Sequence, residues 1–135
     1  MSLFLNDAVL DAALNVIRDN VIRMSLCEGY SSTAVAGALT SFTTDGNGIT
    51  GELAVVVMAP ADFTIQDNGV AGREASVAQK AAVAVAANGI GDNVILWNST
   101  TNIVYAHTGL SVDRAVTTAD TVTFNSWAVQ INDPV

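Results

Sequence analysis

The sequence predicts a mainly β fold, an antiparallel β-sandwich or jelly-roll-like barrel with one N-terminal α-helix. About eight short runs rich in Val, Ile, Thr and aromatic residues follow one another at hairpin-like spacing, with clusters of Gly, Asn and Asp between them. Helical periodicity is clear only near the N-terminus. With 135 residues and no linker-like stretch, we expect an N-terminal helix or arm over residues 1–20 and a single β domain over residues 21–135.

Apolar residues at helical spacing predict an amphipathic helix over residues 3–18. Its apolar face contains Leu3, Leu10, Leu14 and Ile17, with Val9 and Ala13 beside them, and its exposed face contains Asp11 and Asn15. Ser2 can cap this helix, but a later start capped by Asn6 fits the sequence as well. A helix this short needs a surface to pack on, either its own sheet or a neighbouring subunit.

The rest of the chain is expected to form strands. The predicted strands are residues 21–27, 53–58, 62–66, 73–77, 83–87, 94–97, a run that begins at 103, and 121–131. Residues 21–27 alternate strictly, with Met24 and Leu26 on one side and Ser25 and Cys27 on the other. Residues 34–44 fit a helix or a strand equally well, and Asp45-Gly46-Asn47-Gly48 predicts a turn.

A β-hairpin is predicted at the centre of the C-terminal half. Its turn is the polar cluster of residues 98–102, which separates two β-favouring runs. We expect residues 88–92 to form the turn that precedes this hairpin, and residues 109–120 to form a polar connection after it. In the last predicted strand, Phe124 and Trp127 face opposite sides unless a bulge near Asn125-Ser126 resets the alternation.

Composition and charge disfavour several classes of partner. The net charge is −8, from 13 acidic and 5 basic residues, so nucleic acids and anionic membranes should be repelled. No apolar run approaches the ~18 residues that span a bilayer. The single cysteine, Cys27, excludes an intrachain disulfide, which fits synthesis in a reducing cytoplasm. Only 13% of the residues are charged, which suggests extra surface buried in an assembly.

No residue pattern indicates a catalytic, cofactor-binding or metal site. His107 is the only histidine and no triad pattern accompanies it. Cys27 has no nearby base, so we interpret it as a buried, inert thiol. Asp45 and Asn47 lie in a stretch that lacks the remaining ligands of a calcium loop. Trp97 and Trp127 are interpreted as core or interface residues, with a sugar-binding platform as the alternative.

Five segments carry a resemblance that covers most of the chain. They are LNDAVLDAALNVIRDN, VIRMSLCEG, DFTIQDNGVAGREASVAQKAAVAVAANG, DNVILWNSTTNIVYAHT and ADTVTFNSWAVQINDP. In this order, the chain resembles small virion structural proteins of tailed bacteriophages, of the kind found as head decoration or tail-associated proteins. The resemblance implies a multicopy building block of the virion, made in the host cytoplasm, that binds other virion proteins and performs no chemistry.

The leading hypothesis is a capsid decoration (cement) protein that binds the major capsid protein as a homo-oligomer, with a trimer favoured. The alternatives are a tail-, neck- or fibre-associated virion protein, then a carbohydrate-binding module that uses Trp97 or Trp127, then an enzyme. The residues expected at protein interfaces are Leu3, Phe4, Leu10, Leu14, Trp97, Tyr105 and Trp127. No cofactor, nucleic acid or membrane is expected to bind.

Overall fold

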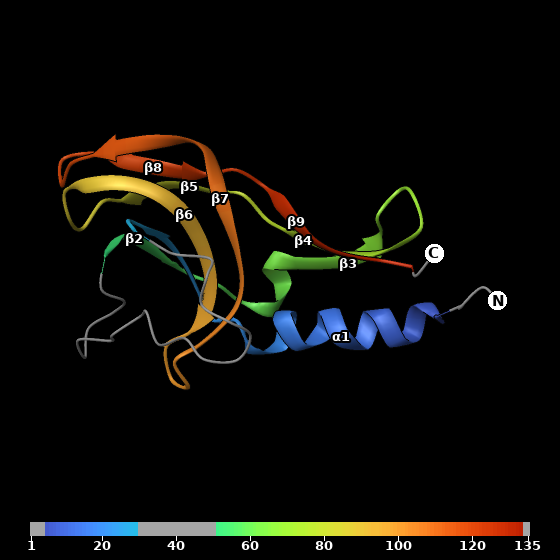
Figure 1. Ribbon diagram of the computed structural model, residues 1–135. Coiled ribbons are helices and arrows are strands. Elements are labelled where there is room, and N and C mark those ends of the chain that lie inside the picture. Colours follow the sequence, from blue (N-terminus) through green and yellow to red (C-terminus); the bar gives the residue numbers. More distant parts are fainter. Residues whose placement is uncertain (1–4, 30–50, 134–135) are drawn as a thin grey trace.

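The computed structural model describes residues 5–29 and 51–133, and it confirms a mainly β fold with antiparallel sheets and one N-terminal helix (Figure 1). In chain order the elements are α1 (Asp7–Asn20), β1 (Arg23–Cys27), β2 (Glu52–Val57), the 3-10 helix η1 (Pro60–Asp62), β3 (Phe63–Asp67), β4 (Gly72–Val77), β5 (Lys80–Ala84), β6 (Gly89–Asn98), β7 (Ile103–Val116), β8 (Thr121–Phe124) and β9 (Trp127–Asn132). The ambiguous segment 34–44 and the predicted turn at 45–48 lie outside the described residues.

Helix α1 starts at the later of the two predicted positions. The Asn6 side chain accepts a hydrogen bond of 2.8 Å from the backbone N–H of Ala8, which satisfies one donor of the first turn. The helix continues to Asn20, two residues beyond the predicted end. At that end, the Val21 N–H donates to the Ile17 carbonyl and the Asn20 side chain donates to the Val16 carbonyl.

The buried face of α1 is rotated from the predicted one. Leu10, Leu14 and Ile17 are buried as expected, and the helix packs on β4 and β3. Val9 and Ala13, predicted beside this face, are exposed, whereas Asp11 and Asn15, predicted to be exposed, are half-buried. The reason is that Arg73 of β4 pairs with Asp11 and turns that side of the helix toward the sheet.

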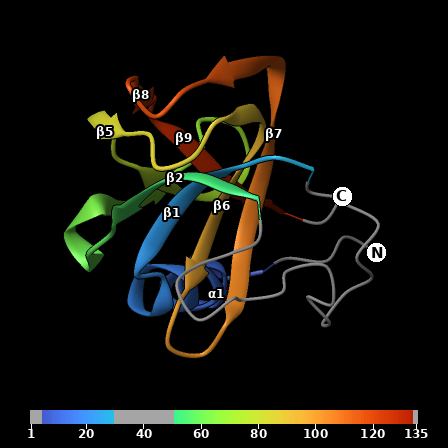
Figure 2. The same ribbon diagram turned by 90° about the vertical axis from the view of Figure 1, so that its left-hand side faces the viewer.

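The largest sheet contains four antiparallel strands in the order β2-β1-β6-β7 (Figure 2). Strand β1 is central: Ser25 lies opposite Val55 of β2 and opposite Ile95 of β6. Both faces of β1 are buried. Its alternating side chains therefore enter two different buried clusters, one on each face of the sheet, and neither set faces solvent.

Two smaller sheets extend this arrangement. Strands β3-β4-β9 form one, which α1 covers, and β5-β8 form the other. An isolated bridge between Ala54 and Val85 joins the edge of β2 to the end of β5. A continuous path of neighbouring strands therefore runs β7-β6-β1-β2-β5-β8, and it rolls around so that β7 bends over β8 (Figure 1).

Strands β6 and β7 are much longer than predicted. Residues 89–92, predicted as a turn, are the start of β6, and residues 109–116, predicted as a polar connection, continue β7 to Val116. Strand β6 contains glycine where a neighbouring side chain packs directly on its backbone: a Cβ atom on Gly91 would lie 2.6 Å from a methyl carbon of Leu26 and clash with it. Pairing with β6 holds the polar residues of β7 in extended conformation.

The predicted last strand is two strands. Phe124 ends β8, which pairs with β5, and Trp127 begins β9, which pairs with β4. The break falls at Asn125-Ser126, where the sequence allowed a bulge. Strand β5 also begins three residues earlier than predicted, at Lys80.

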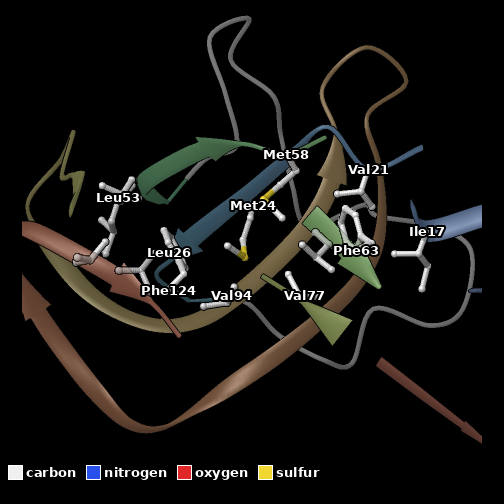
Figure 3. Close-up of a cluster of buried hydrophobic side chains, with 14 of the residues drawn as sticks. Ile17, Val21, Met24, Leu26, Leu53, Met58, Phe63, Val77, Val94 and Phe124 are labelled. Atoms are coloured by element: carbon white, nitrogen blue, oxygen red, sulfur yellow. The ribbon is translucent and has the colours of Figure 1, made fainter. Parts of the chain in front are cut away.

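The hydrophobic core is shared by the helix and all three sheets (Figure 3). Its members include Ile17, Val21, Met24, Leu26, Leu53, Met58, Phe63, Val77, Val94 and Phe124. Because Ile17 packs in the same cluster as Met24 and Phe63, α1 is part of the folded unit in cis. A second, smaller cluster of Cys27, Ile95 and Trp97 lies on the opposite face of the four-stranded sheet.

Candidate functional site

A groove lies between β7 and β8. These consecutive strands are joined by the short turn Thr117–Asp120, in which the Asp120 N–H donates to the Thr117 carbonyl at 2.9 Å and the Thr117 N–H donates to the Asp120 carboxylate at 2.8 Å. Such a turn normally closes a hairpin. Among the described strands, however, β7 pairs only with β6 and β8 pairs only with β5, so the two strands diverge.

The space between the diverging strands, here named the β7–β8 groove, has a volume of about 650 Å³. Its lining residues are Leu26, Val94, Thr108, Leu110, Ser111, Val112, Arg114 and residues 121–127. Buried apolar side chains such as Leu26, Val94 and Phe124 form the floor, and exposed hydroxyl and amide side chains form the rim. A volume in this range is typical of sites that bind a small molecule or a short peptide segment.

Besides the hydroxyl and amide groups of the rim, the β7–β8 groove has two further side chains that can make polar contacts, those of Arg114 and Trp127. Arg114 is the only charged residue among those that line it, in a chain with a net charge of −8. The indole N–H of Trp127 is buried at its edge and has no hydrogen-bond acceptor among the described residues. The residues that line the groove include no carboxylate, histidine or thiol.

A buried polar network lies on the other face of the four-stranded sheet. The Ser25 hydroxyl, which is fully buried, accepts a hydrogen bond of 2.9 Å from the Trp97 indole and donates one of 2.6 Å to the Glu52 carboxylate. The Arg23 guanidinium lies 5.9 Å from the centre of the Trp97 ring, within range of a cation–π interaction. This network orients Trp97 and satisfies its N–H inside the protein.

Cys27 lies beside this network and is inert, as the sequence suggested. Its side chain is fully buried, and burial, reinforced by the negative charges of Glu52 and Asp92, raises the pKa of the thiol to about 12. A thiol with such a pKa is protonated at neutral pH and cannot act as a nucleophile.

Ion pairs connect each of the two smaller sheets to neighbouring elements. Arg73 of β4 pairs with Asp11 of α1 at 2.6 Å and with Asp67 of β3, and these two carboxylates raise the pKa of the guanidinium. Lys80 of β5 pairs with Asp62 of η1 at 2.7 Å. The packing of α1 on β4 brings Asp11 close to Arg73, and the pairing of β3 with β4 places Asp67 opposite it.

The residues predicted at interfaces have different locations. Leu10, Leu14 and Trp97 are buried within the subunit, with 3%, 0% and 2% of their surface exposed, so no partner can reach them while this fold is intact. Tyr105 is half-buried against the main core. Trp127 is half-buried in the lining of the β7–β8 groove, and Leu3 and Phe4 lie outside the described residues.

Sequence reasoning missed the β7–β8 groove because it treated residues 109–120 as a connection. The available signal was the alternation of Leu110 and Val112 with the polar residues Ser111 and Asp113, which is a strand pattern. His107 is exposed on β7, lies opposite Ile95 of β6, and is not among the residues that line the groove.

No protein-family model, curated protein or solved structure matches this chain. Within residues 5–29 and 51–133, no group of three or more His, Cys, Asp or Glu side chains is placed to hold a metal ion. None of the helices in the same residues has the length and apolar character needed to cross a membrane.

Proposed function

We propose that this chain is a structural building block of a bacteriophage virion, and that it acts as a capsid decoration protein bound to the major capsid protein. The order of its sequence segments supports this role, and so does its low content of charged residues. The observation that carries the proposal is the β7–β8 groove. It combines two open strand edges with an apolar floor, which suits binding of another protein more than catalysis.

The mechanism of such a protein is burial of surface between neighbouring capsid subunits. Exposed apolar residues on several elements, among them Val57 of β2 and Val112 of β7, are available for this burial. A stable contact needs about 1,200–2,000 Å² of total buried surface, which a homo-oligomer can supply more easily than one small subunit. A trimer remains the expected form.

The test uses shells assembled from the major capsid protein of the genome that encodes the chain. Purified protein is mixed with these shells and sedimented, and the bound amount is titrated. We expect saturable binding at a fixed ratio to the capsid protein and a higher melting temperature of the decorated shells. A genome without a capsid gene, or shells that sediment without the protein at micromolar concentration, would refute the proposal.

A carbohydrate-binding module is the second candidate, and one observation favours it. Trp127 lies in the β7–β8 groove next to Asn125 and the exposed hydroxyl groups of the rim, a combination that can stack on a sugar ring and bind its hydroxyls. Trp97 is buried and cannot serve as a platform. In a Trp97→Phe variant the fluorescence reports Trp127 alone, and a saturable shift with an oligosaccharide panel would support this candidate over the first.

A further inference from the structure

We infer that the β7–β8 groove is an acceptor site for an extended strand of a partner protein. The inferred partner segment is a β-strand with alternating apolar residues and one acidic residue. This inference deepens the proposed function and rests on it, because it names the part of a virion partner that this subunit would bind.

The first argument is the sheet topology. Along the path β7-β6-β1-β2-β5-β8, the strands β2 and β5 meet at the isolated bridge between Ala54 and Val85, and β7 and β8, which would close the path, do not pair with each other. Each of these strands pairs along one edge with its own neighbour, and residues of both strands line the groove. A strand edge presents backbone N–H and C=O groups, and their natural partner is another extended chain.

The second argument is the pattern of side chains along the groove. On β8 the buried side chains of Val122 and Phe124 alternate with the exposed side chains of Thr121 and Thr123, and on β7 the lining includes Leu110, Val112 and Arg114. A strand between them would place every second side chain over the floor formed by Leu26 and Val94, and the remaining side chains in solvent. The occupant must therefore alternate between apolar and polar residues.

The third argument is charge. Arg114 is the one charged side chain in the lining, and it lies near the turn that joins β7 to β8. An acidic residue near one end of the inserted strand would complement it. The rest of the chain is strongly acidic, so this positive charge marks the position at which a carboxylate is accepted.

The geometry also restricts direction and length. Because β7 and β8 run in opposite directions, an inserted strand is antiparallel to one and parallel to the other (Figure 1). Strand β8, Thr121–Phe124, lines one side of the groove and ends before the break at Asn125-Ser126. Paired strands match residue for residue, so about four residues of a partner would pair with this side.

The experiment uses a panel of capped nonapeptides in which Val alternates with Thr and a single Glu is moved through the Thr positions. Binding is followed by backbone amide shifts and by hydrogen exchange of the intact protein. We expect at least one peptide to protect amides within both residues 110–116 and residues 121–124. The same peptide with a central Pro, which cannot pair on both sides, should not protect them.

A charge exchange isolates the role of Arg114. The Arg114→Gln variant should bind the best Glu peptide about 3- to 10-fold more weakly, and it should bind the matching Gln peptide as well as the unchanged protein does. Arg18→Gln, which removes an exposed charge on α1, is the matched control and should change neither affinity.

Two results would overturn the inference: no peptide of the panel protects either strand, or the protected amides lie at another sheet edge such as β3. Its failure is distinguishable from that of the proposed function. If shells bind the protein but the peptides do not, the strand-acceptor inference falls and the decoration role stands. If a peptide binds in the groove but shells do not bind, the decoration role falls.

Discussion

Removing the Ser25 hydroxyl should destabilise the protein through a single buried hydrogen-bond network. In the Ser25→Ala variant, the Trp97 indole N–H loses its acceptor at 2.9 Å and the Glu52 carboxylate loses a donor at 2.6 Å. Both bonds are made at a side chain with no exposed surface, so water cannot replace the lost hydroxyl. A buried donor left without a partner costs about 1–3 kcal/mol.

The free energy of unfolding should therefore fall by about 2–3 kcal/mol, because the lost contact with Glu52 adds to the unsatisfied indole. For a chain of this length, that corresponds to a melting temperature lower by about 6–12 °C. The measurement is urea unfolding followed by tryptophan fluorescence. Ser76→Ala is the matched control: this half-buried serine of β4 makes no side-chain hydrogen bond among the described residues, and its replacement should change the free energy by under about 0.5 kcal/mol.

A double-mutant cycle with Trp97→Phe separates this mechanism from a general packing defect. Phe has no N–H, so the Ser25→Ala change should cost clearly less in that background. If Ser25→Ala is within about 0.5 kcal/mol of the unchanged protein, or if its cost is the same in both backgrounds, the network is not the source of stability we describe.

Three further outcomes are expected. Ellman's reagent should leave Cys27 unmodified at pH 8 until the protein unfolds, and rapid labelling of the folded protein would contradict this. Because the pKa of the Cys27 thiol is raised to about 12 in the folded state, the free energy of unfolding should fall as the pH rises above about 9. Gly72→Ala should lower the melting temperature far more than Gly69→Ala does. Both glycines have positive φ, but only at Gly72 would a Cβ lie 2.2 Å from a carbonyl oxygen of β9. Equal decreases in melting temperature would disprove the clash. Burial tends to raise the pKa of Asp62, but the hydrogen bonds from Lys80 and from a backbone N–H outweigh it and lower the pKa. The free energy of unfolding should therefore fall as the pH drops below about 4, and the Lys80→Met variant should lose less. If the variant shows the same fall at low pH, the ion pair of Lys80 and Asp62 is not its source.

The fold class and the central elements could be predicted because their signals are local. Strict alternation marked β1, helical spacing marked Leu10, Leu14 and Ile17, and a polar cluster marked the turn between β6 and β7. In each case neighbouring residues in the sequence carry the pattern that packing later uses.

The errors came from residues whose conformation is decided by distant partners. Gly89 and Gly91 looked like turn residues, but their strand needs them so that Leu53 and Leu26 can approach the backbone. The salt bridge between Arg73 and Asp11 joins residues 62 positions apart. The β7–β8 groove depends on which edges remain unpaired, and no local pattern specifies that.

The pairing scheme has a consequence for how the chain acquires its structure. Strand β1 lies between β2 and β6, and its partner Trp97 comes more than 70 residues after Arg23; strand β4 likewise receives its second neighbour only from β9. Local turns therefore cannot assemble the sheets one hairpin at a time. Domains dominated by such long-range pairing fold in milliseconds to seconds instead of microseconds. During biosynthesis the N-terminal half must remain incomplete until β6 has left the ribosome, and the three-stranded sheet closes last.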